Sequence, residues 1–220
     1  GLKMMKWLSD HMLVRGINHF VPHAFSGITP DYDCPPHFYE GGTFSQFKDF
    51  KLLMEYSNRV STLLTDGSHK CKVALLYRAE NEWAGGMVGH EKKCAKILAD
   101  NQIDFDIVPI DYLADAKVEN GEFLLGDEKY PCLVVAKSEY LPKNSVDVIN
   151  RLADDGVKVI FAGGCPEKYS ENEAEILFKN ANCVDYENLA EFFENNPECE
   201  FYHWGDMDFG GISIFQFTKD

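Results

Sequence analysis

Residues 73–77, Val-Ala-Leu-Leu-Tyr, form a short apolar run in which polar and apolar side chains do not alternate. Two more runs of this kind follow at Leu133–Ala136 and Val157–Ala162. Segments whose apolar residues have helical spacing accompany them, over His90–Asn101 and Ser145–Asp155. Strands that are apolar throughout are typical of a parallel sheet with helices on both faces. The pattern therefore predicts an α/β domain built in three layers.

Less regular segments complete this domain. We expect a strand, a small β-hairpin and two helices, in this order: Asp104–Ile110, Glu119–Lys129, Glu171–Asn180 and Asn188–Asn195. The α/β domain is then predicted to span residues 70–199. A β tail over residues 200–220, with strands at Phe201–Trp204 and Ile212–Phe217, is expected to lead to a further domain.

Residues 1–67 carry a different pattern. Apolar residues at helical spacing end at Gly16, and a short apolar strand is expected over Ile17–Val21. After a Pro-rich loop, Thr43 and Gln46 have the spacing of a capping box and predict the start of another helix. A (β/α)8 barrel ends with a helix, a strand and a helix, and its last strand delivers a loop to the catalytic face. We therefore expect residues 1–67 to be the C-terminal remnant of such a barrel.

The composition excludes several classes of partner. The chain has 220 residues and a net charge of −15, which argues against nucleic-acid binding because phosphate contacts need clustered Lys and Arg. The apolar runs are too short to span a bilayer, so no membrane partner is expected. Seven cysteines are scattered without a CxxC pair, which favours a reducing, cytoplasmic compartment over a disulfide framework. No cofactor and no metal are expected.

Longer motifs carry a resemblance to a known family. They are RGINHFVPHAF (15–25), DCPPHF (33–38), YSNRVSTLL (56–64), KVALLYRAENEW (72–83) and YPCLVVAKSEYLP (130–142). Together they resemble the junction between the barrel and the accessory domain of bacterial glycoside hydrolases, either family 42 β-galactosidases or rhamnosidase-like enzymes. The resemblance implies a flavodoxin-like accessory domain, similar in fold to class I glutamine amidotransferases, that serves oligomerisation. It also implies a homo-oligomer whose carbohydrate substrate is bound by the parent enzyme.

Cys165 is the first candidate for chemistry, because a cysteine after a buried strand suggests the nucleophile of an amidotransferase. That reaction needs the backbone N–H of the next residue as an oxyanion donor. The next residue is Pro166, which has no N–H. The G-x-C-x-G pattern is absent as well. We therefore predict a structural role for Cys165.

Glu80, Glu82 and Trp83 form the second candidate, on a loop predicted to follow the first strand of the sheet. In an extended segment, residues two apart point the same way, which does not supply the opposed carboxylates of a glycosidase. An aromatic ring beside acidic groups does suit sugar binding. The alternative is a solvated loop or an interface. The nearby glycines match no phosphate-binding motif.

His23 is the third candidate, since it follows the expected last barrel strand and would face the substrate. By the resemblance, the catalytic carboxylates lie on earlier barrel strands, so this chain is expected to contain no catalytic residue. Asp33, Cys34 and His37 could imitate a metal cluster with His23, but their spacing is non-standard and a packed loop is the better interpretation.

An aromatic concentration in the same region favours self-association: Phe38, Tyr39, Phe44, Phe47 and Phe50. The sequence as a whole is interpreted as a non-catalytic accessory and oligomerisation fragment of a glycoside hydrolase. Two alternatives stay open. One is a degenerate enzyme of amidotransferase-like fold, and the other is a stand-alone sugar-binding module.

Overall fold

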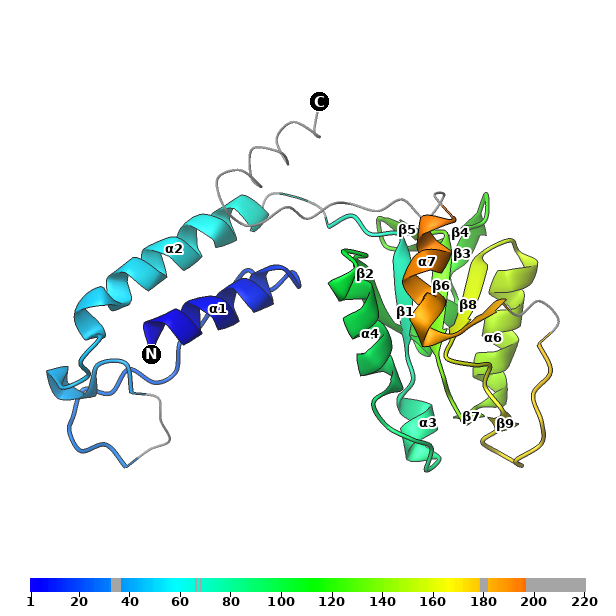
Figure 1. Ribbon diagram of the computed structural model, residues 1–220, viewed down its shortest axis with the longest axis horizontal. Coiled ribbons are helices and arrows are strands. Elements are labelled where there is room, and N and C mark those ends of the chain that lie inside the picture. Colours follow the sequence, from blue (N-terminus) through cyan, green and yellow to red (C-terminus); the bar gives the residue numbers. More distant parts are fainter. Residues whose placement is uncertain (33–36, 66, 68, 179–181, 197–220) are drawn as a thin grey trace. The chain divides into compact units, whose positions relative to one another are not determined.

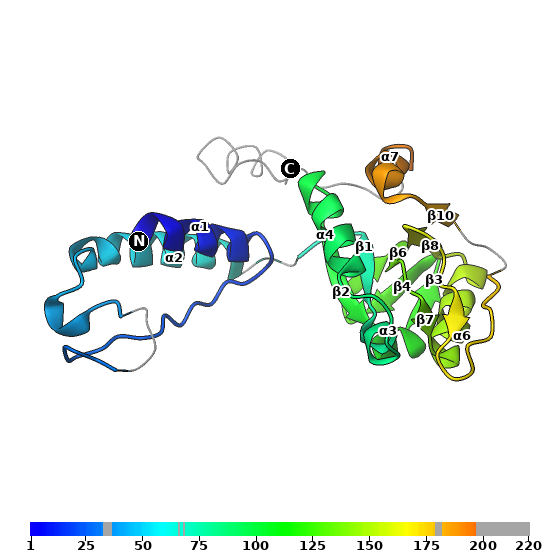
Figure 2. The same ribbon diagram turned by 60° about the horizontal axis from the view of Figure 1, so that its bottom comes forward.

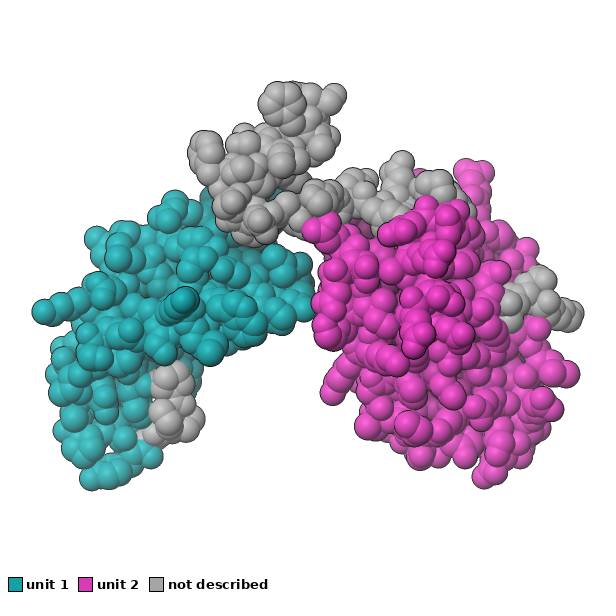
Figure 3. Space-filling model, in the orientation of Figure 1, with its two compact units in different colours: residues 1–69 teal, residues 70–220 magenta. Residues whose placement is uncertain are grey.

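The computed structural model describes residues 1–32, 37–65, 67, 69–178 and 182–196 (Figure 1). The chain divides into two compact units, residues 1–69 (unit 1) and 70–220 (unit 2), which are coloured separately in Figure 3. The two strands predicted for the tail lie outside the described residues, as do Asp33 and Cys34 of the metal-like cluster.

Unit 2 is built on five parallel strands in the order β10-β8-β6-β1-β2. Their bounds are β1 Val73–Tyr77, β2 Phe105–Pro109, β6 Cys132–Ala136, β8 Lys158–Ala162 and β10 Asn182–Val184. Counted along the chain, the five strands run 2-1-3-4-5 across the sheet, which is the flavodoxin-like order. The predicted parallel α/β sheet is confirmed, and the three long apolar runs are its central strands.

Helices cover both faces of this sheet (Figure 2). On one face, α4 (His90–Asp100) and α7 (Leu189–Glu194) pack on Leu75, Val134 and Ile160. On the other, α5 (Ile110–Ala114) and α6 (Lys143–Asp154) pack on Leu76, Val135 and Phe161. Neighbouring residues of a strand point to opposite faces, so a strand buried on both sides must be apolar at every position. This accounts for the lack of alternation in the sequence.

Smaller elements surround the sheet. The expected hairpin is an antiparallel meander of β3 (Lys117–Glu119), β4 (Glu122–Leu125) and β5 (Glu128–Tyr130), anchored by the fully buried Phe123. Three further short elements are β7 (Tyr140–Leu141), β9 (Lys168–Tyr169) and the 3₁₀ turn η2 (Tyr186–Asn188).

The helix predicted near Glu171–Asn180 is wrong over its described part, residues 171–178. The chain makes a tight turn there. Glu173 has a positive φ of 56°, its N–H donates to the Tyr169 carbonyl, and the Tyr169 N–H donates to the Ala174 carbonyl. A reversal of this kind ties up the backbone groups that a helix needs and excludes helical dihedral angles.

Unit 1 is a pair of packed helices, α1 (Leu2–Leu13) and α2 (Phe47–Thr65), with a 3₁₀ turn η1 (Glu40–Gly42) between them. Its small core consists of Phe38, Phe50 and Leu53. Two of the aromatic residues that were expected to favour self-association, Phe38 and Phe50, are therefore buried inside the unit. Phe25, Tyr39 and Phe47 add a second group of ring contacts.

Two expectations for unit 1 are wrong. Ile17–Val21 is not a strand, because no other strand among the described residues of this unit is there to pair with it. The capping box also fails. Gln46 instead accepts a hydrogen bond from the Leu2 N–H at 3.0 Å, and Thr43 donates to the Glu40 carbonyl at 2.8 Å. The assignment of residues 1–67 to a barrel stays a prediction.

Candidate functional site

The sheet order reverses between β1 and β6, which in open α/β sheets is where ligands bind, beyond the carboxyl ends of the strands. Two segments meet there. The first follows β1 and contains Arg78 and α3 (Ala79–Trp83), and the second, Lys137–Glu139, follows β6. This edge is the candidate site on topological grounds.

Asn81 fills the space between these segments. Its side chain is fully buried. The side-chain oxygen accepts hydrogen bonds from the backbone N–H of Glu139 at 2.8 Å and of Tyr140 at 3.1 Å, and its amide donates to the Met87 carbonyl at 3.1 Å. A Cβ added at Gly86 would collide with the Asn81 amide, so glycine is needed for this close approach. The Asn81 side chain therefore occupies the space between the two segments.

Arg78 also binds the loop that follows α3. It is 1% exposed, and its Nε and Nη2 both lie 2.9 Å from the Glu91 carboxylate. Nη2 also donates to the Met87 carbonyl at 3.0 Å, and the Met87 N–H donates to the Glu139 carboxylate at 3.0 Å. Most of the polar groups at this edge thus bind one another and hold the loop after α3 in place, whereas Nη1 of the buried Arg78 has no hydrogen-bond partner among the described residues.

His90, at the start of α4, and Tyr186, in η2, form a further pair of polar side chains in unit 2. The Tyr186 hydroxyl lies 3.0 Å from His90 Nδ1, and Lys93 lies 4.4 Å from the centre of the Tyr186 ring. Burial, followed by the charges of Arg78 and Lys137, lowers the pKa of His90 below its usual value. The imidazole is therefore neutral at pH 7 and able to bond the hydroxyl.

The predicted sugar-contact residues Glu80, Glu82 and Trp83 lie together on α3. The segment is helical, so the assumption of an extended loop is wrong. Residues two apart on a helix point about 160° away from each other, and the two carboxylates therefore diverge. Trp83 is 81% exposed and is available for contact. His23 belongs to unit 1, where it is an exposed residue of an irregular segment, and its role as a substrate contact stays a prediction.

Cys165 forms a disulfide with Cys183, with a Cα–Cα distance of 6.1 Å. The bond ties the loop after β8 to β10, and this leaves Cys165 no thiol for nucleophilic attack. The sequence did not reveal the pair, since the two residues are 18 positions apart and meet only because β8 and β10 are neighbours. Disulfides are typical of oxidising compartments, contrary to the expected scatter of free thiols. The compartment of the protein stays a prediction.

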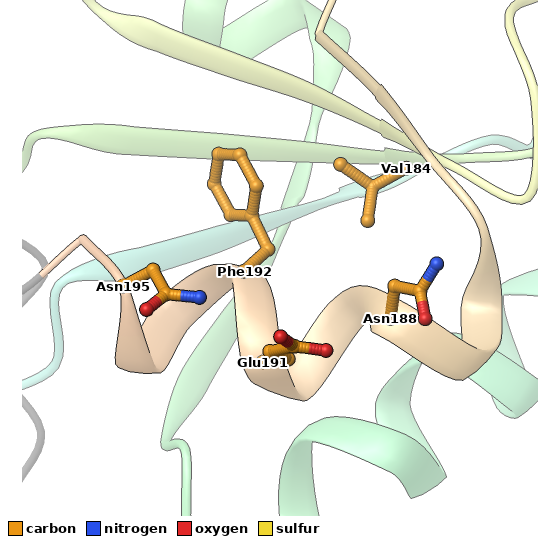
Figure 4. A pocket seen from close by; sticks show the side chains of 5 residues that line it. All are labelled: Val184, Asn188, Glu191, Phe192 and Asn195. Atoms are coloured by element: carbon orange, nitrogen blue, oxygen red, sulfur yellow. The ribbon is translucent and has the colours of Figure 1, made fainter.

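Two pockets lie away from the predicted residues. One, of about 310 Å³, is lined by residues on and beside α7: Val184, Asn188, Glu191, Phe192 and Asn195 (Figure 4). The other, of about 300 Å³, lies at the start of α6 and the turn after β9: Lys143, Tyr169, Glu171, Asn172 and Ala174. Among the described residues no helix is both long enough and apolar enough to cross a membrane.

Comparison with known proteins adds a weak structural likeness. No protein-family model matches the sequence, and no curated protein matches it. Among solved structures, the chain is similar to Gan42B, a GH42 beta-galactosidase from G. stearothermophilus, and to a catalytic mutant of that enzyme, at 11% and 10% identity. Both have a TM-score of 0.44, and each match covers 64% of this chain and 20% of that one. The chain thus corresponds to about a fifth of that enzyme. A likeness of this size does not establish a family.

Proposed function

We propose that the chain is a non-catalytic accessory part of a glycoside hydrolase, which supports the parent enzyme and its self-association. The observation that carries the proposal is the filled edge between β1 and β6. Asn81 occupies the crevice with all of its hydrogen bonds directed to the backbone of the chain. A site that binds substrate keeps polar groups unpaired and facing a cavity.

The side chains needed for the rival enzymatic functions are engaged or misplaced. A glycosidase needs two carboxyl groups facing each other about 5–9.5 Å apart. Glu80 and Glu82 diverge on α3, and Glu139 accepts the Met87 N–H. A glutaminase needs a free thiol, and Cys165 is in a disulfide. Both arguments favour a supporting role for unit 2.

The attribution to a carbohydrate-active parent rests on the sequence motifs. The elements KVALLYRAENEW and YPCLVVAKSEYLP supply β1, α3 and β6, so the residues that carry the resemblance are those that build the filled edge. In this proposal unit 1 is the end of the catalytic barrel, and the sugar is bound and cleaved by residues of the parent enzyme that this chain lacks.

Turnover assays test the proposal. The purified chain is incubated with a panel of nitrophenyl glycosides and, separately, with glutamine. We expect neither nitrophenol nor ammonia above the rate of a heat-denatured sample. Glycoside turnover that is lost in Glu80→Gln or Glu82→Gln would overturn the proposal, and ammonia release abolished by Cys165→Ala would favour the amidotransferase-like enzyme.

The exposure of Trp83 favours a second function, sugar binding by unit 2. A flat ring that is 81% exposed beside two carboxylates could cover the apolar face of a pyranose. Calorimetric titration with galactose and rhamnose tests this alternative. Binding that is lost in Trp83→Ala and kept in Trp7→Ala, a matched exposed tryptophan of unit 1, would support it.

A further inference from the structure

The segment of unit 2 that contains β10, η2 and α7 (residues 182–194, here called the edge segment) lies at one end of the central sheet (Figure 2). Among the described residues, β10 pairs with β8 alone, over three residues. Helix α7 has six residues, of which Leu189 and Phe193 are fully buried in the core on one face of the sheet. Short elements with few buried side chains are those that open locally before the whole fold unfolds.

The Cys165–Cys183 disulfide cross-links the edge segment to the loop after β8. Cys183 is the middle residue of β10. The same loop makes two further contacts with the edge segment. The Gly163 N–H donates to the Val184 carbonyl at 2.8 Å, and the Tyr186 ring lies so close to Gly163 that a Cβ there would collide with it. The disulfide therefore acts at the point where the edge segment joins the sheet.

A reductant in solution can reach this disulfide. Cys183 is an exposed residue and Cys165 is half-buried. A disulfide is cleaved when a thiolate attacks one of its sulfur atoms, and access to that atom is one of the factors that set the rate. The free cysteines of the described part of the chain, Cys71, Cys94 and Cys132, are buried, and burial raises the pKa of Cys94 to about 12. Buried thiols of this kind are inert, so the attacking thiolate comes from another molecule and not from one of these three residues.

We propose that the Cys165–Cys183 disulfide is a redox-sensitive switch that controls the opening of the edge segment. The reductant is a dithiol. Its first thiolate attacks one sulfur and forms a mixed disulfide, while the other cysteine leaves as a thiolate and takes up a proton. Its second thiol, as the thiolate, then attacks the mixed disulfide, so that both cysteines end as thiols and the dithiol, oxidised by two electrons, ends as a disulfide.

Reduction changes the surface that unit 2 presents. Without the cross-link the edge segment is released from β8 more often, because the open state gains the conformational freedom that the closed loop denied it. Opening uncovers apolar side chains such as Ile160, which is fully buried in the same cluster as Leu189 and Phe193. The reduced chain thus exposes an apolar surface that the oxidised chain keeps covered.

Hydrogen–deuterium exchange followed by mass spectrometry tests the switch. The full chain, purified without reductant, is compared with the same chain after treatment with dithiothreitol, and peptide mapping of alkylated samples reports whether the bond is present or broken. We expect reduction to accelerate exchange in residues 182–194 at least about tenfold, since the disulfide closes a loop of 18 residues. The amides of β1 and β6 should stay protected at times at which the edge segment has exchanged, because the opening is local.

The controls assign the effect to this bond. The double variant Cys165→Ser/Cys183→Ser should exchange like the reduced parent chain and should not respond to dithiothreitol. Cys94→Ser, which removes a buried free thiol of α4, should respond to dithiothreitol as the parent chain does. If circular dichroism shows that the double variant does not fold, reduction of the parent chain decides the proposal by itself.

Three results would overturn the proposal. The first is an unchanged exchange rate of residues 182–194 after reduction. The second is equal exchange in this segment and in β1 and β6 of the reduced chain, since the opening would then be global. The third is a peptide map in which Cys165 and Cys183 are not linked in the chain purified without reductant.

Discussion

Replacing Asn81 by alanine is the sharpest test of how the β1–β6 edge is held. The change removes the partner of three backbone groups, the N–H of Glu139 and of Tyr140 and the carbonyl of Met87. A buried polar group left unsatisfied costs about 1–3 kcal/mol. Water can reach part of this loop, so we take the lower bound for each group. Asn81→Ala is then expected to lower the unfolding free energy by about 3 kcal/mol.

Urea denaturation of the full chain, followed by far-UV circular dichroism, measures this loss. Glu82→Ala is the matched control, because Glu82 is an exposed residue of the same helix and should change the free energy by no more than about 0.5 kcal/mol. A shift for Asn81→Ala that does not exceed the control, at an unchanged dependence on urea, would refute the reasoning. The crevice would then be free to accommodate a ligand, and the proposed function would lose its main support.

Three further predictions concern the same unit. Cys165→Ser, or reduction of the Cys165–Cys183 bond, should cost about 3 kcal/mol for a loop of 18 residues, measured by denaturant unfolding with and without reductant. Because the folded-state pKa of His90 is lowered, the unfolded chain binds more protons, and the unfolding free energy should fall as the pH drops from 7 toward 5; His90→Gln should flatten this part of the stability profile. Gly86→Ala should destabilise the fold by about 1–3 kcal/mol, and Gly85→Ser, at a position with open space but positive φ, serves as a control that reports backbone strain alone.

The sheet was predictable because its signal is local and strong. Runs such as Leu133–Ala136 are buried on both faces of the sheet, and every residue of such a run must therefore be apolar, which is visible directly in the sequence. The strand expected at Ile17–Val21 shows the limit of such reasoning. An apolar run becomes a strand only where a neighbour supplies hydrogen bonds, and pairing is a property of the tertiary structure.

The candidate site was less predictable, because its key residues act through distant partners. The sequence predicts Glu80, Glu82 and Trp83 as sugar contacts. In the structure it is the buried Asn81, next to Glu80 and Glu82 in the chain, whose hydrogen bonds connect the segments that follow β1 and β6. Its hydrogen-bond partners are 58 and 59 positions away, and no spacing rule covers that range. A polar residue soon after a buried strand was the available signal. The Cys165–Cys183 bond was hidden for the same reason.

The outermost strands of the sheet have a consequence for how copies of this protein can meet. Among the described residues, β2 and β10 end the sheet and have only five and three residues. β2 closes with Pro109, which has no N–H to donate, and is preceded by the charged Asp104. Short, charged and proline-terminated edges discourage the addition of a foreign strand. Partners that assemble with this unit are therefore expected to dock through side chains on its helices, and the sheet is protected against growing from copy to copy into a fibre.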